Sequence, residues 1–187
     1  MVAILEIPEV RERLSRLSVD EYHRLGEFNE NGRRTELIRG LIIEKMSKTP
    51  LHRLIASLLY EQLRAQAPKG FSVWKEEPLT LSDSEPEPDV SVIRGEMRDF
   101  GTAHPTTAEL VVEVAVSSPA LDRENAHLYA EAGVGEYWIV LARERQVEIY
   151  RRPEGGVYKE RQLVARDGIL QCPAMPSIRI PVNDLFT

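Results

Sequence analysis

The stretch Leu110-Val111-Val112-Glu113-Val114-Ala115-Val116 decides the fold, because it is apolar throughout except for a single glutamate. A run this rich in β-branched residues is typical of an interior strand whose two faces are both covered. A carboxylate is costly to bury unless it is paired, hydrogen-bonded or bound to a cation. The pattern therefore predicts a central strand and marks Glu113 as a candidate functional residue.

A second acid opens another apolar strand, in the sequence Pro88-Asp89-Val90-Ser91-Val92-Ile93. If the two strands are adjacent in the sheet, Asp89 and Glu113 can converge on one cation, since alternate residues share a strand face. Mg²⁺ would suit such a site, because it takes one or two carboxylates, keeps waters and accepts phosphate oxygens. A purely structural role stays open, in which the two acids pair with arginines or cap backbone amides.

Composition limits the class of protein. The 187 residues fit one domain, so we expect a single domain over residues 1–187. No run of 18 apolar residues is present, and residues 1–10 lack the features of a signal peptide. The single cysteine, Cys172, fits a reducing cytoplasm. The net charge of −6 argues against non-specific duplex binding but leaves room for a local basic groove.

The remaining patterns predict an α/β or α+β fold with an N-terminal β-hairpin. Two β-rich runs, residues 34–38 and 41–44, flank the short turn at Arg39-Gly40. Apolar residues at helical spacing predict an amphipathic helix from Pro50 to Ala67, and a second helix runs from Ser118-Pro119 to Gly133. Further strands are expected at residues 71–76, 79–81, 89–93, 109–116, 137–140 and 146–150, and a loop at 94–107.

One polar residue interrupts the apolar stripe of the second helix. Asn125 follows Leu121 by four residues and lies on the same stripe as Leu128 and Ala132. We expect Asn125 to face the sheet, where a buried polar group needs a partner. A position at the rim, hydrated by water, is an equally open interpretation.

Four stretches together resemble the PD-(D/E)xK nuclease superfamily and, within it, the Uma-two branch of restriction endonuclease-like proteins. The resemblance covers roughly residues 18 to 150 in order. It is carried by Thr35-Glu36-Leu37-Ile38-Arg39-Gly40, by Glu85-Pro86-Glu87-Pro88-Asp89-Val90-Ser91-Val92, by Leu110-Val111-Val112-Glu113-Val114, and by residues 129–140, from Tyr129 to Val140.

The resemblance implies a restriction-endonuclease-like fold, with a mixed central β-sheet flanked by helices. It implies a nuclease that uses Mg²⁺ or Mn²⁺ on nucleic acid, with DNA favoured, in the form of a homodimer. Asp89 and Glu113 would hold the metal, and Glu36 would support them from the first hairpin. The metal would activate a bound water and stabilise charge on the phosphate.

The chain departs from this family at its usual lysine. Two residues after Glu113, the motif position holds Ala115, and the helix position where the branch often has lysine aligns with Asn125. Lys75 and Lys159 are remote in sequence and cannot be placed in the site. His52 lies where the family often has histidine, but packing at the helix start is the favoured interpretation.

Three functions therefore remain open, with Glu36, Asp89, Glu113 and Asn125 as the candidate catalytic positions. The chain is a metal-dependent endonuclease, or a catalytically impaired relative that binds nucleic acid or a protein partner. The third alternative is a protein whose buried acids form structural ion pairs without metal.

Overall fold

The structure is a computed structural model and describes residues 6–26, 34–45, 47–117 and 119–186. The chain divides into two compact units, residues 1–45 with 82–85 and residues 46–81 with 86–187. Each unit is described by itself, and the expected single domain over residues 1–187 stays a prediction.

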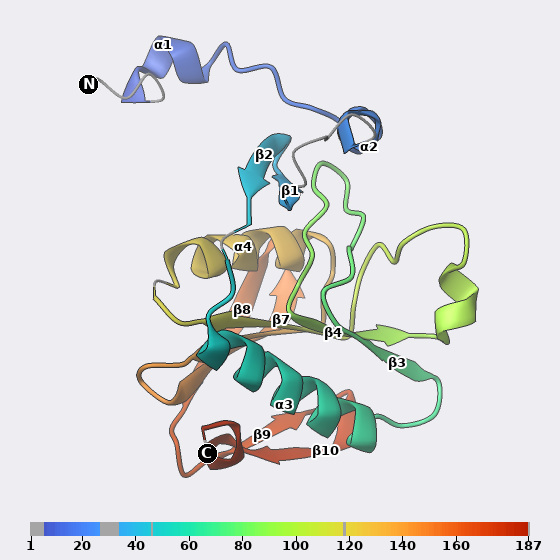
Figure 1. The fold of residues 1–187 in the computed structure, drawn as a ribbon, viewed down its shortest axis with the longest axis vertical. Helices are drawn as coiled ribbons and strands as arrows, with labels where there is room; N and C mark the ends of the chain where they lie inside the picture. The colour runs from blue at the N-terminus through green and yellow to red at the C-terminus, as the bar shows by residue number, and fades with distance from the viewer. Residues whose placement is uncertain (1–5, 27–33, 46, 118, 187) are drawn as a thin grey trace. The chain divides into compact units, whose positions relative to one another are not determined.

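The first unit is built around the predicted N-terminal hairpin (Figure 1). It contains α1 (Pro8–Arg11), α2 (Val19–Gly26), β1 (Thr35–Ile38) and β2 (Leu41–Glu44). The two strands pair antiparallel around Arg39 and Gly40, whose φ angles of 53° and 74° suit the tight turn of a hairpin. A Cβ at Gly40 would lie 2.6 Å from the Arg16 Cβ, so this turn requires glycine.

The second unit contains a six-stranded sheet in the order β3-β4-β5-β6-β7-β8. Neighbouring strands pair antiparallel, except β5 and β6, which are parallel and are connected through helix α4. The strands are β3 (Phe71–Trp74), β4 (Val90–Arg94), β5 (Leu110–Ala115), β6 (Glu136–Leu141), β7 (Gln146–Glu154) and β8 (Val157–Val164).

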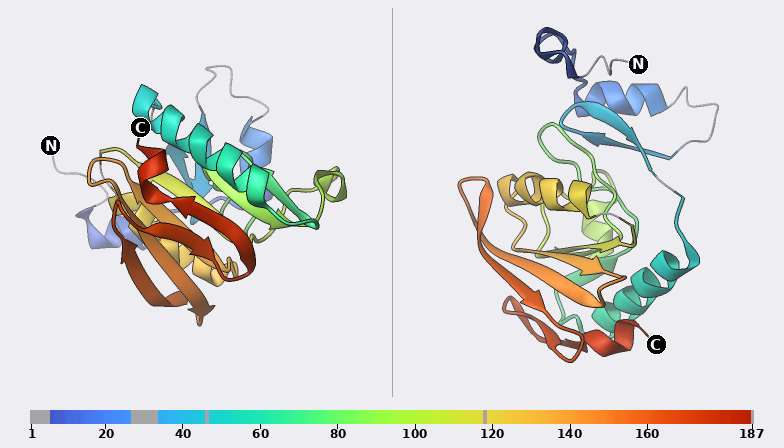
Figure 2. Two further views of the ribbon diagram at one scale, coloured as in Figure 1. Left: turned by 90° about the horizontal axis from the view of Figure 1, so that it is seen from below. Right: turned by 90° about the vertical axis from the view of Figure 1, so that its left-hand side faces the viewer.

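Two helices cover opposite faces of this sheet (Figures 1 and 2). Helix α3 (Pro50–Gln66) packs against one face together with the hairpin of β9 (Ile169–Cys172) and β10 (Met175–Pro181) and the 3-10 turn η3 (Val182–Leu185). Helix α4 (Ala120–Glu131) lies on the other face, against β6, β7 and β8. The predicted α+β architecture, a mixed sheet flanked by helices with an N-terminal hairpin, is confirmed.

Helix boundaries follow the sequence signals. Helix α3 begins after Thr49, whose side chain accepts a hydrogen bond from the His52 amide, and Pro50 occupies the first helical position. Gly133 adopts a φ of 71° just beyond α4 and ends that helix as predicted. The predicted role of Ser118 at the other end of α4 lies outside the described residues.

Two local predictions are wrong. Residues 79–81 form no strand, because the Leu79 amide bonds to Pro86 and the Thr80 amide bonds to Pro105 instead of a strand ladder. Within the predicted loop 94–107, η2 (Met97–Phe100) forms a 3-10 turn closed by reciprocal bonds between Glu96 and Asp99. Both errors fall where side chains and loops supply the partners that a periodic pattern does not show.

Candidate functional site

Strand pairing brings the two predicted acids together. β4 and β5 are adjacent and antiparallel, and Val90 lies opposite Val112. Asp89, one residue before β4, therefore comes next to Glu113, one residue after Val112. Asp89 is 5 % exposed, and Glu113 is the one partly exposed residue of the otherwise buried strand β5.

Backbone amides bond to both of these carboxylates. The Asp89 amide donates to Glu113 Oε2 at 3.2 Å, and the Val114 amide donates to Asp89 Oδ2 at 2.9 Å. From α4, the Tyr129 hydroxyl donates to Glu113 Oε1 at 3.1 Å. The two carboxylates are therefore held side by side at the end of β5 by groups from three elements.

Two cationic or polar side chains reach Asp89 from the start of α3. Lys48 Nζ lies 2.9 Å from Asp89 Oδ1 and 3.1 Å from Glu76 Oε1, and His52 Nε2 lies 2.9 Å from Asp89 Oδ2. Burial would raise the pKa of Asp89, but hydrogen bonds and positive charge from His52 and Lys48 outweigh it and lower the pKa from 3.8 to about 2. The Asp89 carboxylate is ionised throughout the neutral range.

His52 carries an unsatisfied atom at this site. Its Nδ1 is buried and has no hydrogen-bond partner among the described residues. Buried polar atoms in folded proteins almost always have a partner, and the exceptions commonly mark a place for water or a ligand. The unsatisfied nitrogen sets this cluster apart from a completed structural ion pair.

Comparison with protein-family models matches residues 19–183 to Uma2, a family described as "putative restriction endonuclease". The chain belongs to the Uma2 family. Among solved structures it is similar to a "putative nuclease belonging to DUF820" from Anabaena variabilis ATCC 29413, with a TM-score of 0.76. The identity is 21% over 91% of this chain and 97% of that chain, which shows a common fold. The comparison with curated proteins finds no match.

Membership of Uma2 confirms the resemblance predicted from the four sequence stretches, and the structure adds a lysine that the sequence analysis did not identify. A lysine does reach the acids: it is Lys48, which precedes α3 and is 41 residues from Asp89 in sequence. The favoured packing role of His52 is also incomplete, because its ring contacts Asp89. The signal that could have found both was the helix start at Thr49-Pro50, which fixes the residues around it.

The other two predicted positions have different surroundings. Asn125 is buried in α4, which agrees with the first of its two open interpretations, and lies one helical turn before Tyr129 on the same face of the helix. Glu36 lies in β1 and pairs with Lys45 inside the first unit. The roles of Asn125 and Glu36 in catalysis stay predictions.

Elsewhere in the second unit, buried carboxylates are clasped by arginines. Glu148 is 2 % exposed and bonds to Arg123 and Arg161, and Glu136 bonds to Arg151. Such pairs have their acceptors occupied by fixed guanidinium groups, which is the geometry of structural ion pairs. Asp89 instead meets a lysine and a histidine, both suited to chemistry in which protons or charge change.

The donor set fits a small, hard divalent cation. Restriction endonuclease-like proteins generally use divalent metals. The adjacent oxygens of Asp89 and Glu113 match the one or two carboxylates from which Mg²⁺ is usually held, with waters and substrate completing its shell. No group of three or more His, Cys, Asp or Glu side chains that could hold a metal occurs among the described residues.

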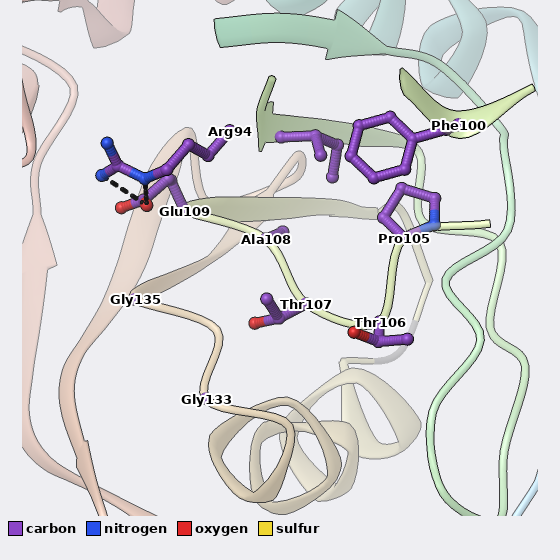
Figure 3. Close-up of a pocket in the computed structure, with 10 residues that line it drawn as sticks. Arg94, Phe100, Pro105, Thr106, Thr107, Ala108, Glu109, Gly133 and Gly135 are labelled. Carbon is purple, nitrogen blue, oxygen red and sulfur yellow. Dashed lines mark hydrogen bonds and ion pairs between the residues drawn. The ribbon is translucent and has the colours of Figure 1, made fainter. Parts of the chain in front are cut away.

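A pocket of about 380 Å³ lies at the opposite end of β4 and β5, where Arg94, Phe100, Pro105, Thr107 and Glu109 line it (Figure 3). Arg94 and Glu109 form an ion pair across its rim at 2.7 Å. The cation of this pocket is thereby neutralised, and its walls carry none of the site carboxylates.

Within the described residues, no helix is long and apolar enough to cross a membrane.

Proposed function

We propose that this Uma2 protein is a divalent-metal-dependent endonuclease that hydrolyses phosphodiester bonds in DNA. The observation that carries the proposal is the pair of adjacent carboxylates, Asp89 and Glu113, with Lys48 Nζ 2.9 Å from Asp89. Two acids and one lysine at a sheet margin are the charges that phosphodiester hydrolysis needs: ligands for a cation and a donor for the phosphate.

Asp89 and Glu113 would hold the metal. When bound, the metal supplies a water of lowered pKa and positive charge for the phosphate oxygens. Tyr129 fixes one oxygen of Glu113, and the Val114 amide fixes one oxygen of Asp89, so both carboxylates are oriented before substrate arrives. The low pKa of Asp89 keeps it in the charged form that a metal ligand requires.

Lys48 would take the role of the family lysine. Its side chain is 16 % exposed, and its ammonium is shared between Asp89 and Glu76. A flexible lysine at this point can exchange one carboxylate for a phosphate oxygen of the substrate, stabilising the charge that develops there. His52, whose Nδ1 lacks a partner among the described residues, would orient Asp89 through Nε2.

The alternative is a catalytically impaired relative that binds nucleic acid or a protein partner. The observation that favours it is Ala115 at the motif position of the lysine, together with Asn125 in α4. If Lys48 supplies the charge of the missing lysine, the reason for expecting impaired catalysis no longer holds. The two functions therefore predict different effects of replacing Lys48.

Nicking of supercoiled plasmid with Mg²⁺ or Mn²⁺ tests the proposal. We expect activity in the wild type, its loss in Asp89→Ala and Glu113→Gln, and no change in Glu160→Gln, which removes an equivalent charge from the surface pair with Arg152. Titration calorimetry with Mn²⁺ should show binding by the wild type and none by Glu113→Gln. Equal nicking by wild type and Asp89→Ala would trace the activity to a contaminant and end the nuclease proposal.

A swap of lysines separates the two functions. We expect Lys48→Met to lower the rate of nicking far more than it weakens DNA binding, and the double variant Lys48→Met with Asn125→Lys to recover part of the rate. Retained activity in Lys48→Met would show that Lys48 is not the missing lysine. A wild type that binds DNA without cleaving it would establish the impaired relative.

We further propose a homodimer, because one subunit offers one pair of acids and a double-strand cut needs two. Light scattering measures the mass, and a linear plasmid product measures double-strand cleavage. A monomer that yields only nicked circles would contradict the dimer.

A further inference from the structure

A second pocket, of about 360 Å³, opens beside the carboxylate pair, and Lys48 belongs to both. The pocket is lined by Lys48, Pro50, Arg53, Leu54 and Ser57, from the start of α3 and the segment before it. Lys48 Nζ, 2.9 Å from Asp89, forms the boundary between the pocket and the acids. A ligand in this pocket therefore lies next to the proposed cleavage site.

Two of the five residues that line the pocket, Lys48 and Arg53, are cationic. Arg53 and Ser57 are one turn apart on α3 and share a helix face. Lys75, just beyond β3, donates to Ser57 Oγ at 2.9 Å, so a third cation contacts a residue of the pocket lining.

The arginine of this pocket differs from the arginine of the pocket in Figure 3. The Arg53 side chain is exposed and has no hydrogen bond or ion pair among the described residues. In the pocket of Figure 3, by contrast, Arg94 is neutralised by Glu109. An arginine that lines a pocket and has its five donors unused is suited to bind a planar or tetrahedral oxyanion.

Leu54 has an unexpected place here. Helical spacing puts Leu54 in the apolar stripe of α3, yet it is 46 % exposed and lines the pocket, whereas Ile55 and Leu59 are buried. An apolar wall next to two cations fits a ligand that is part sugar and part phosphate. The sugar would contact the apolar wall and the phosphate would contact the cations. A free inorganic anion would leave this wall without a partner.

We propose that the Lys48–Arg53–Ser57 pocket is a subsite for the backbone of a nucleic-acid strand, holding the phosphate that neighbours the one to be cleaved. The inference rests on the proposed nuclease function and adds to it the path of the strand: across the start of α3, past Lys48, to Asp89 and Glu113. Arg53 would bind the neighbouring phosphate, Ser57 would be oriented by Lys75, and Lys48 would lie between the two phosphates.

The test measures binding without hydrolysis. A short fluorescein-labelled DNA duplex is titrated with protein in metal-free buffer, and anisotropy is recorded at several salt concentrations for wild type, Arg53→Ala and Arg64→Ala. Arg64 is an exposed arginine in the last turn of the same helix, so it removes the same charge away from the pocket. Melting followed by circular dichroism checks that each variant is folded.

We expect Arg53→Ala to weaken duplex binding roughly fivefold, the loss typical of an exposed charged contact. The slope of log affinity against log salt should fall by about 0.9, because one phosphate contact is lost. Arg64→Ala should change neither quantity, and Arg53→Lys should restore part of the affinity without the bidentate geometry. Ser57→Ala is a second variant and should weaken binding by a smaller factor.

Each contrary result has a distinct meaning. Equal losses in Arg53→Ala and Arg64→Ala, or no loss in either, would overturn the subsite while leaving the nuclease intact, provided that nicking still depends on Asp89. A wild type that fails to bind the duplex at low salt would overturn the subsite. If that protein also shows no nicking that depends on Asp89, the nuclease proposal fails with it.

Discussion

Replacing Asp89 by asparagine should remove the part of the pH dependence of the unfolding free energy that comes from this carboxylate. In the wild type the pKa of Asp89 is lowered from 3.8 to about 2 by His52 and Lys48, against the effect of burial. The ionised carboxylate therefore stabilises the folded state above the unfolded pKa of 3.8. That stabilisation is lost as the pH falls through the folded pKa near 2.

The magnitude follows from the two pKa values. Each unit of difference is worth about 1.4 kcal/mol, so a shift from 3.8 to about 2 corresponds to about 2 kcal/mol of unfolding free energy. Asp89 is 5 % exposed, so solvent screens this interaction little. We expect the stability difference between wild type and Asp89→Asn to shrink by about 2 kcal/mol between about pH 6 and about pH 2.

Urea titrations at a series of pH values, in buffer with a chelator, measure this difference. Trp74 and Trp138 are the only tryptophans of the chain and both lie in the unit that carries Asp89, so their fluorescence follows the relevant unfolding. Carboxylates elsewhere, including Glu148, titrate in both proteins and cancel in the comparison. A stability difference that stays constant with pH would refute the stated role of Lys48 and His52.

Three further results are expected. Tyr129→Phe removes the hydroxyl that donates to Glu113 and should lower the unfolding free energy by about 1 kcal/mol in urea titration; an unchanged midpoint would mean that the bond contributes nothing. Leu59→Ala empties a fully buried position under the sheet and should cost about 2 to 5 kcal/mol in the same assay, and a loss below 1 kcal/mol would contradict the tight packing of α3. Cys172 has its thiol pKa raised by burial to about 12, so a disulfide reagent at about pH 8 should modify it only after urea is added; fast reaction in the folded protein would contradict this burial.

The fold was accessible from the sequence because its strongest signals are local. The β-branched run of β5 and the capped start of α3 each specify an element without reference to the rest of the chain. The stretch Leu79 to Leu81 led to a wrong prediction, because both leucines are buried although the Leu79 amide bonds to Pro86 and the Thr80 amide to Pro105. Burial there comes from loop packing, which alternation cannot distinguish from a strand.

The site was only partly accessible for the same reason. Asp89 and Glu113 were identifiable because each is an acid in an apolar strand, an anomaly visible in one line of sequence. Lys48 and His52 are a lysine in a polar segment and a histidine at a helix start, and both have many ordinary roles. Only the approach of α3 to the start of β4, a contact over 41 residues, shows that they meet Asp89.

The position of Lys48 explains how the chain can lack lysine at residues 115 and 125 and still present one to the acids. What the proposed chemistry requires is an ammonium close to the carboxylates that would hold the metal, and any backbone position from which the long side chain reaches that point will serve. Here the β4–β5 register fixes the acids, and the Thr49 cap fixes the residue just before α3. The strand register and the helix cap form independently of each other, and together they define the distance between Lys48 and Asp89. Lysines of this kind in related chains should be sought by their reach to the acids, since their spacing in the sequence is free to change.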